Sequence, residues 1–561
     1  MKRNTGHIAE REFDVVVVGG GIFGCCCAWD AAQRGLSVAL LERRDFSGAT
    51  SANSFKIVHG GIRYLQHGDL PRIRESSRER SVLLKIAPHL VRPLPIVIPT
   101  YGHGKHGKAL LRLGCRVYDL LTLDRNRGIT DAARRIPPSR GLSREEVLEQ
   151  FPGLDPSGLT GGVLFHDGQM LDPPRLALCY LKSACEAGAQ AANYTEVTGL
   201  IRDGARVVGV EARDTLNGDE FDVRGKVVVN AAGPWVPKLL DKMLGPERSP
   251  DLTFSRDACF VVKRRLTGSC ALAVSGRTRD PDALLSRGKR HLFLAPWRDY
   301  TLVGVWHKVH RSTPDDLLVT ENELDEFIAE VNETYPAAGI SRDEVSVQNS
   351  GLVLFGENRD GATDLSYGKR SLVLDHSTEH GIEGLISLVG VRYTTSRGVA
   401  ERVVDLVHGK LEKPVTRSRT ASTPIFGGDT GDIEEFVAQQ TARLTSKIDT
   451  ASARALLLGH GTRHGEVIRL VDENPELARS VGSSNVIRAQ IVHAAREEMA
   501  CKLSDVVCRR TDLCTGANPG DDALTTSADI LAEELGWDKH RKRAELEEVR
   551  EMVSPVQVQL A

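Results

Sequence analysis

FDVVVVGGGIFGCCCAWDAAQRGLSVALLERRD, residues 13–45, reads in order as a strand, a glycine turn, a helix and a second strand. The run that ends at Val18 is apolar and β-branched, which is typical of a strand covered on both faces. Gly19, Gly21 and Gly24 follow with GxGxxG spacing. The first glycine permits a tight turn, the second lets backbone approach a pyrophosphate, and the third lets the helix pack on the strand. We therefore expect a strand over 14–18, a helix over 22–34 and a second strand over 37–41.

An acidic residue closes this unit. Glu42 ends the second strand, about 20 residues beyond the glycines, where a carboxylate can accept hydrogen bonds from a ribose hydroxyl. A 2′-phosphate would meet like charge there, so the pattern favours an unphosphorylated adenosine ribose. The unit predicts a dinucleotide site and leaves NAD and FAD both open.

Two later segments favour the longer cofactor. KVVVNAAGPWV (226–236) runs from an apolar strand into small residues at 231–233, and GLISLVGVRYTTSRGVAERVVDLV (384–407) reads as a strand, a glycine turn and a helix. A helix N-terminus aimed at a ring would stabilise negative charge on a reduced flavin. A site assembled from three distant segments suits FAD better than a compact NAD site.

The bulk composition excludes some classes. The chain has 561 residues, a hydrophobic content of 41% and a formal charge of −2. This length suits about three or four domain-sized units, and the near-neutral charge gives no sign of nucleic-acid binding. No stretch approaches the ~20 apolar residues of a membrane span, and no secretory signal is expected at the N-terminus. The eleven cysteines lack zinc-site spacing, so we expect reduced thiols in a cytoplasmic protein and no metal site.

Three stretches resemble one protein family. They are ATSANSFKIVHGGIRYLQHGD (49–69), NAAGPWV (230–236) and the tail segment IVHAAREEMACKLSDVVCRRTDL (491–513), with an acid followed by two arginines. Together they are similar to the FAD-dependent, aerobic-type glycerol-3-phosphate dehydrogenases, within the wider glycine oxidase and D-amino-acid oxidase-like superfamily. The resemblance runs over nearly the whole chain.

The resemblance implies an α/β fold in three parts. A Rossmann-like FAD-binding domain would comprise 1–90, 150–245 and 375–412. An inserted antiparallel-sheet substrate domain would comprise 91–149 and 246–374, and a C-terminal α-helical domain would comprise 428–552.

The resemblance also implies an activity: a secondary alcohol, that of glycerol 3-phosphate, loses hydride to FAD and yields dihydroxyacetone phosphate. Electrons would then pass to a quinone or another acceptor, with peripheral contact at the inner face of a membrane; a homodimer is left open. The residues that would line FAD are Gly19, Gly21, Gly24, Glu42, Thr50, Ser51, Ser54, His59, Gly60, Gly61, Ala232, Gly233, Gly390, Arg392 and Thr394. The residues that would meet a small anionic substrate are Arg63, Tyr64, His307, Arg370 and Arg392.

The chain departs from the family on the substrate side. Cys259 stands where a histidine is common, His307 where an aspartate is common, and Val353 where a substrate-binding arginine is common. Arg392 replaces a lysine. A substrate alcohol needs a base, and histidine suits that work near neutral pH. His307 is therefore either this base or a polar residue at a strand end. Trp306 either walls the pocket or lies in the core.

These departures leave three functions open: glycerol 3-phosphate oxidation, oxidation of another small substrate such as a hydroxy acid, polyol or amine, and flavin binding without catalysis.

A helix with an apolar stripe is expected within 108–125. Leu110, Leu113, Val117, Leu120 and Leu121 share one face, which is more typical of a domain core but also suits a membrane surface. The preceding loop, 101–108, is basic and is expected to bind no metal despite its two histidines. A disordered tail is expected beyond Val553.

Overall fold

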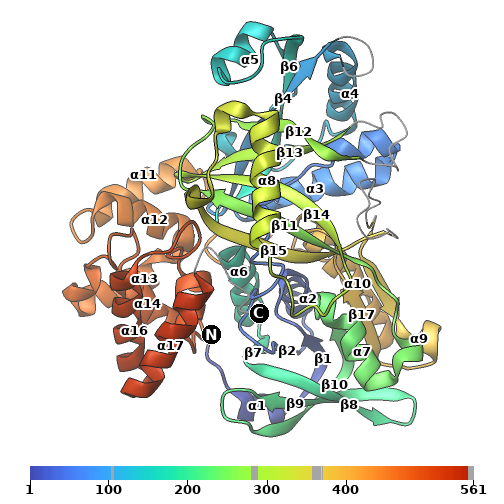
Figure 1. Cartoon of the computed structure of the whole chain (residues 1–561). Helices are drawn as coiled ribbons and strands as arrows, with labels where there is room; N and C mark the ends of the chain where they lie inside the picture. The colour runs from blue at the N-terminus through green and yellow to red at the C-terminus, as the bar shows by residue number, and fades with distance from the viewer. Residues whose placement is uncertain (103–106, 280–288, 357–367, 369, 554–561) are drawn as a thin grey trace.

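The computed structural model of the chain describes residues 1–102, 107–279, 289–356, 368 and 370–553. Figure 1 shows two sheets, with the C-terminal helices gathered on one side of them. The expected disordered tail lies outside the described residues, as do residues 103–106 of the basic loop and the question of metal binding there.

The first sheet holds the GxGxxG unit at its centre. β1 (Glu12–Val18) pairs in parallel with β2 (Val38–Leu41) on one side and β10 (Glu220–Asn230) on the other. The strand order is β16-β17-β10-β1-β2-β7, and a hairpin of β8 and β9 pairs along β10. The other strands of this sheet are β7 (Gln190–Ala192), β8 (Thr195–Asp203), β9 (Arg206–Asp214), β16 (Leu372–Asp375) and β17 (Leu385–Val389).

Helices bury both faces of this sheet. α2 (Ile22–Gln33), α6 (Pro173–Glu186) and α10 (Ser396–Lys410) share one core with the inward side chains of β1, including the three consecutive cysteines 25–27. α7 (Val236–Leu244) and the β8–β9 hairpin cover the other face. The continuous apolar run of β1 is explained by this double cover.

The second sheet is mostly antiparallel, with the order β15-β11-β14-β13-β12-β4-β6-β3. Its strands are β3 (Ile57–Val58), β4 (Val91–Tyr101), β5 (Arg140–Leu142), β6 (Leu159–Met170), β11 (Phe254–Val262), β12 (Ala271–Arg279), β13 (Lys289–Trp297), β14 (Tyr300–His310) and β15 (Val345–Leu354). α8 (Glu321–Thr334) packs on one face, where Trp306 stacks on Phe327 with ring centroids 4.3 Å apart. Trp306 is therefore a core residue and does not wall the pocket.

The expected domain boundary at residue 150 is wrong for one strand. We placed 150–245 in the FAD-binding part, but β6 pairs with β4 along its whole length, from Val91 opposite Met170 to Tyr101 opposite Leu159. A strand joins the sheet in which its backbone hydrogen bonds are satisfied, and for β6 that is the second sheet. β3, expected in the FAD-binding part, also pairs in the second sheet, and most of β16, expected in the substrate domain, pairs in the first. The other expected boundaries stay predictions.

The remaining helices include the C-terminal set from α11 onward, which encloses cores of its own. They are α1 (Thr5–Ala9), α3 (Leu70–Ile86), α4 (Lys108–Leu121), α5 (Arg144–Gln150), α9 (His376–His380), α11 (Ile433–Leu444), α12 (Thr450–His460), α13 (His464–Glu473), α14 (Arg488–Glu497), α15 (Leu503–Asp505), α16 (Asp521–Leu535) and α17 (Lys539–Met552), with the shorter turns η1 (Ile62–His67) and η11 (Val506–Arg510). The eleven cysteines are all free. Across the described ranges, no helix combines the length and apolar character needed to cross a bilayer.

The apolar stripe of α4 is exposed, so the expectation that it packs in a core is wrong. Leu110, Leu113, Val117 and Leu120 are 41–67% exposed, while Cys115 and Tyr118 on the other face are buried. An amphipathic pattern shows that one face is apolar, but it does not show what covers that face.

Candidate active site

A cavity of about 750 Å³ lies where the carboxyl ends of β1, β2 and β10 face the second sheet. This is the edge at which open α/β sheets usually bind ligands. We call the part lined by the GxGxxG turn and Glu42 the nucleotide end, and the part lined by β11, β13 and β14 the substrate end.

Close backbone approach shapes the nucleotide end. Gly19 has a φ of +105°, and a Cβ atom there would lie 2.7 Å from the carbonyl oxygen of Ala231. A Cβ on Gly24 would lie 1.9 Å from the carbonyl oxygen of Gly19. Gly19 and Gly21 line the cavity, whereas Gly24 lies behind them and lets α2 pack on β1.

The N-terminus of α2 opens on this cavity. Its N-cap residue is Gly21, which has no side chain, and the Oγ of Ser51 from a distant loop accepts the N–H of Ile22 at 3.0 Å. The Glu42 carboxylate accepts backbone N–H groups from Gly20 at 2.6 Å and Arg44 at 2.9 Å. Burial raises the pKa of Glu42, although these two hydrogen bonds act in the opposite direction. A helix N-terminus beside a fixed carboxylate can hold a diphosphate and a ribose together.

The rest of the expected cofactor set lies on neighbouring loops. Thr50 exchanges two hydrogen bonds with the backbone of Leu352 and so ties its loop to β15. The residues of this set that line the cavity are Thr50, Ser51, Ser54, His59, Gly61, Ala232, Gly233, Gly390, Arg392 and Thr394. Gly60 does not line the cavity, and a Cβ there would lie 2.2 Å from both Arg80 and Tyr118.

Three arginines gather around Tyr64 at the substrate end. The guanidinium carbons of Arg72 and Arg392 lie 4.4 Å and 4.9 Å from the centre of the Tyr64 ring, and Arg63 lines the same part of the cavity. The positive charge of these arginines contributes to lowering the pKa of His59. Its pKa falls to about 3, first because of burial and then because of the charges of Arg392 and Arg63.

His307 faces this cavity from the middle of β14 and not from a strand end. Its Nδ1 lies 2.7 Å from Oδ1 of Asp257, which stands opposite it on β11. Cys259 and Val353 also line the cavity. Burial raises the pKa of the Cys259 thiol to about 11, so this residue is a neutral wall and not a nucleophile.

Arg370, the remaining expected substrate contact, is exposed and does not line the cavity in the part of the chain that the structure describes. Its charge contributes to lowering the pKa of Asp69, so Arg370 lies near the N-cap of α3.

Sequence reasoning missed three residues of this end: Lys56, Arg72 and Asp257 line the cavity. Lys56 is 3% exposed, and its ammonium lies 4.8 Å from the centre of the Trp297 ring. Burial lowers its pKa. Lys56 lies within the stretch 49–69 that resembles the family, so its sequence position could have indicated that it lines the cavity. No local pattern marks Arg72 or Asp257.

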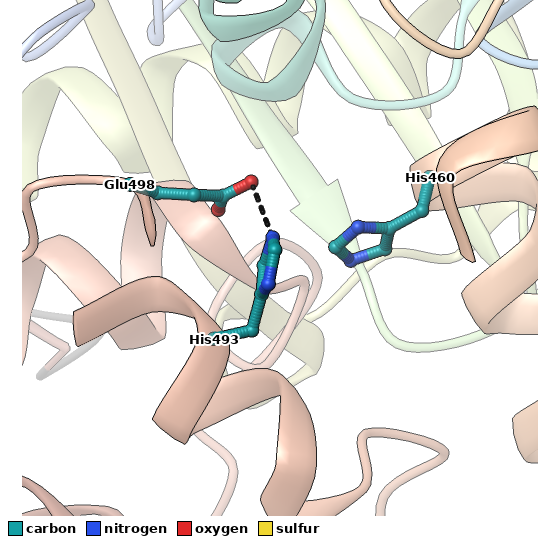
Figure 2. A group of neighbouring side chains, drawn as sticks. All are labelled: His460, His493 and Glu498. Carbon is teal, nitrogen blue, oxygen red and sulfur yellow. Dashed lines mark ion pairs between the residues drawn. The ribbon is translucent and has the colours of Figure 1, made fainter. Parts of the chain in front are cut away.

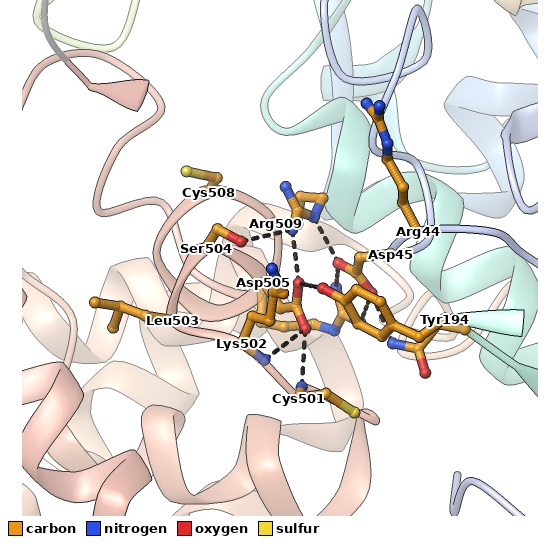
Figure 3. A network of polar contacts seen from close by, with 12 residues as sticks. Arg44, Asp45, Tyr194, Cys501, Lys502, Leu503, Ser504, Asp505, Cys508 and Arg509 are labelled. Atoms are coloured by element: carbon orange, nitrogen blue, oxygen red, sulfur yellow. Dashed lines mark hydrogen bonds and ion pairs between the residues drawn. The ribbon is translucent and has the colours of Figure 1, made fainter. Parts of the chain in front are cut away.

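The C-terminal domain is bound to the nucleotide end by a buried ion-pair network (Figure 3). Arg510 forms two parallel hydrogen bonds with Asp45, at 2.6 and 2.7 Å, and Arg509 binds both Asp45 and Asp505. Although burial favours the neutral acid, the charges of Arg510 and Arg509 hold the pKa of Asp45 well below its usual range. Asp45 lines the cavity, so the C-terminal helices support the loop that carries Glu42.

A second buried cluster joins α6 to the C-terminal domain (Figure 2). His460, His493 and Glu498 have ligand-type atoms within 4.8 Å of one another. However, Arg175 and Lys182 of α6 already bind Glu498, at 2.6 and 3.0 Å. Two buried cations oppose binding of a third, so this cluster is better explained as a junction between domains than as a metal site.

The cavity fits FAD. It joins a diphosphate-binding turn to a pocket of charged side chains, and the buried Oγ of Ser54 in its wall has no hydrogen-bond partner among the residues that the structure describes. A bound cofactor would supply such a partner.

Comparisons with known proteins agree with this architecture. Residues 14–406 match the family described as FAD dependent oxidoreductase, and residues 418–542 match the C-terminal domain of alpha-glycerophosphate oxidase. A glycerol-3-phosphate dehydrogenase of Synechocystis sp. is 32% identical over 98% of each chain. The mitochondrial glycerol-3-phosphate dehydrogenase of Mus musculus is 31% identical over 96% of this chain and 72% of its own.

The fold is also that of a solved relative. The glycerol-3-phosphate dehydrogenase of Bacillus halodurans, complexed with FAD, is 25% identical and covers 99% of this chain and 97% of its own, with a TM-score of 0.77. The expected fold class, cofactor and family are thereby confirmed. The chain belongs to the FAD-dependent oxidoreductases, on the branch that carries the alpha-glycerophosphate oxidase type of C-terminal domain.

Proposed function

We propose that this protein oxidises the secondary alcohol of glycerol 3-phosphate, or of a closely similar small anion, and passes the electrons to a quinone. The observation that carries this proposal is one cavity that combines the arginine cluster at Tyr64 with a histidine–carboxylate pair. The relatives named above as glycerol-3-phosphate dehydrogenases support the substrate.

The arginine cluster suits a phosphate dianion. Forked guanidinium groups bind phosphate through charge-assisted hydrogen bonds. Val353 removes one guanidinium that the family pattern predicts, and Arg72 on α3 supplies another from a different element. The Nε of Arg72 donates to Asp69 at 2.9 Å, which orients the fork and leaves the cluster cationic as a whole.

His307 is the candidate base. Bound FAD would accept hydride from the carbinol carbon. The Nε2 atom of His307 would take the proton of the substrate hydroxyl, because Nδ1 is engaged by Asp257. Burial of the pocket between the two sheets would keep this proton transfer away from bulk water.

A membrane quinone requires that the protein reach a bilayer surface. The exposed apolar side chains of α4 are accompanied by exposed arginines at 112, 116 and 127. An apolar helical face flanked by basic residues can lie in the interface of an anionic bilayer. We therefore propose peripheral attachment through α4 at the inner membrane face.

The test is anaerobic reduction of the bound flavin. We expect glycerol 3-phosphate to bleach the flavin at micromolar concentrations and glycerol to need at least a hundredfold more. His307→Gln should slow bleaching by a factor on the order of 10²–10⁴, the usual contribution of a general base.

A second candidate is oxidation of a different small substrate. Cys259, His307 and Val353 all depart from the family pattern at the substrate end, which favours it. In the same experiment, faster bleaching by a hydroxy acid, a polyol or an amine would select this alternative. If no compound bleaches the flavin, the protein binds flavin without this catalysis.

A further inference from the structure

The Asp257–His307 contact is built into the register of the second sheet. The two residues are directly opposite each other across the β11–β14 ladder. β11 is also paired on its other edge with β15, where Gly351 stands opposite Asp257. A strand paired on both edges holds its side chains more firmly than an edge strand does. The pair therefore has a fixed geometry inside the cavity.

A third side chain holds the carboxylate. Ser255 lies two residues before Asp257 and so points from the same face of β11. Its hydroxyl is buried and donates to Oδ1 of Asp257 at 2.6 Å, the same oxygen that lies 2.7 Å from Nδ1 of His307. This hydrogen bond selects one orientation of the carboxylate.

The chemistry of the pair assigns the histidine tautomer. An ionised carboxylate can only accept a hydrogen bond, so Nδ1 of His307 must carry a proton. The lone pair of the neutral imidazole is then on Nε2. When Nε2 takes a second proton, Asp257 is the counter-charge next to the imidazolium ion.

The rest of this end makes that counter-charge necessary. The other charged side chains that line it are mainly cationic and come from the 55–58 segment, η1, α3 and the loop before α10; they are Lys56, Arg63, Arg72 and Arg392. A positive charge formed on His307 during the reaction would therefore share the cavity with like charges, and Asp257 at 2.7 Å is its partner of opposite charge. His291 on β13 also lines this wall.

We infer that Asp257 is a positioning residue, which fixes His307 with its lone pair on Nε2 and stabilises the imidazolium ion formed when the substrate hydroxyl loses its proton. Ser255 supports it by holding the carboxylate. This inference rests on the proposed function, because it gives His307 the role of base.

The first test compares Asp257→Asn with the wild type by anaerobic flavin bleaching across pH. An amide lacks the charge, and its NH₂ group can donate to Nδ1 and so favour the opposite tautomer. We expect the rate constant for bleaching at saturating substrate to fall about a hundredfold, with little change in substrate affinity. In Ser255→Ala the same rate constant should fall about three- to tenfold. Glu326→Gln, which removes an exposed carboxylate near Lys308 outside the cavity, should match the wild type.

The second test reads the tautomer directly. In flavin-bound protein labelled with ¹⁵N-histidine, the signal lost in His307→Gln identifies His307. That signal should show a protonated Nδ1 in the wild type. In Asp257→Asn the protonation pattern of the ring should differ from that of the wild type. If Asp257→Asn does not fold, Ser255→Ala takes its place in this comparison. A protonated Nε2 in the neutral wild-type ring would overturn the inference, as would an Asp257→Asn rate profile unchanged in height and shape. If the wild type is not bleached by any substrate, the proposed function fails, while the tautomer measurement still decides the assignment.

Discussion

At the nucleotide end of the cavity the close contacts are made by backbone, whereas at the substrate end they are made by charged side chains from distant segments. Gly19 and Gly24 belong to one turn of six residues, and their neighbours leave no room for a Cβ. Arg72, Asp257 and His307 come from a helix and two strands that only the folded chain brings together. A local motif can therefore define the first end but not the second. Substitutions at the nucleotide end should therefore affect folding and flavin content, whereas substitutions at the substrate end should affect substrate kinetics.

The largest effect is expected at Gly24. In Gly24→Val, the Cβ atom would lie 1.9 Å from the Gly19 carbonyl oxygen, and neither backbone segment can move away without separating α2 from β1. Clashes of this kind belong to the most destabilising class of substitutions. We expect no soluble, yellow protein, measured by expression and by the flavin absorbance of the purified fraction.

Gly409→Ala is the matched control, because a Cβ at this glycine of α10 meets nothing within 4 Å. It should retain full flavin content and gain up to about 1 kcal/mol of stability from helix propensity. Normal flavin binding by Gly24→Val would show that the backbone approach at this end is not required.

The next largest effect concerns the ion pairs between Asp45 and the C-terminal domain. Arg510→Met leaves the buried Asp45 carboxylate with less compensation, which typically costs about 3–5 kcal/mol. We expect a lower Tm and faster loss of FAD, measured by the fluorescence of released flavin. Arg496→Met removes an exposed pair with Glu534 and should cost at most about 1 kcal/mol.

The pH dependence of the same variant follows from the pKa of Asp45. Its folded-state pKa is depressed, so the stabilisation is complete above the ordinary aspartate range and is lost as the pH falls toward the folded-state value. The wild type should therefore lose more stability than Arg510→Met on acidification below pH ~4. Parallel losses in denaturant titrations at neutral and acidic pH would contradict this account.

The parts of the fold that the sequence predicts well are those with local signals. The expected strand at 14–18, helix at 22–34 and strand at 37–41 correspond to β1, α2 and β2. The assignment of β6 was wrong because its partner β4 lies about 60 residues earlier, and strand pairing over such a distance leaves no periodic mark in either segment.

The candidate site divides in the same way. Glycine spacing and Glu42 indicate the nucleotide end directly. Val353 could be read as a missing arginine, but the guanidinium of Arg72 comes from α3 and carries no motif. The role of Asp257 can be recognised only from the strand register, which places it opposite His307.

A smaller effect is expected at Arg72. Arg72→Met removes one forked donor from the anion-binding cluster, and a charge-assisted hydrogen bond contributes roughly 1.5–3 kcal/mol. We expect KM for glycerol 3-phosphate to rise about ten- to a hundredfold with kcat nearly unchanged, and the preference for glycerol 3-phosphate over glycerol to fall by a similar factor. Arg78→Met, an exposed residue of the same helix, should leave both values unchanged. An unchanged preference in Arg72→Met would remove this residue from the substrate end.

The smallest effect on catalysis is expected on α4, which lies outside both ends of the cavity. Leu120→Gln places an amide on the exposed apolar face, where Leu120 is 67% exposed. If this face enters a bilayer, the loss of one buried leucine costs about 1.5 kcal/mol, or roughly tenfold in partition to anionic vesicles. Flavin bleaching in solution should not change. Leu216→Gln, at an exposed leucine between β9 and β10, is the control and should bind vesicles as the wild type does. Equal flotation of all three proteins with vesicles would exclude α4 as the attachment site, and would leave the electron transfer to quinone to be explained by another surface.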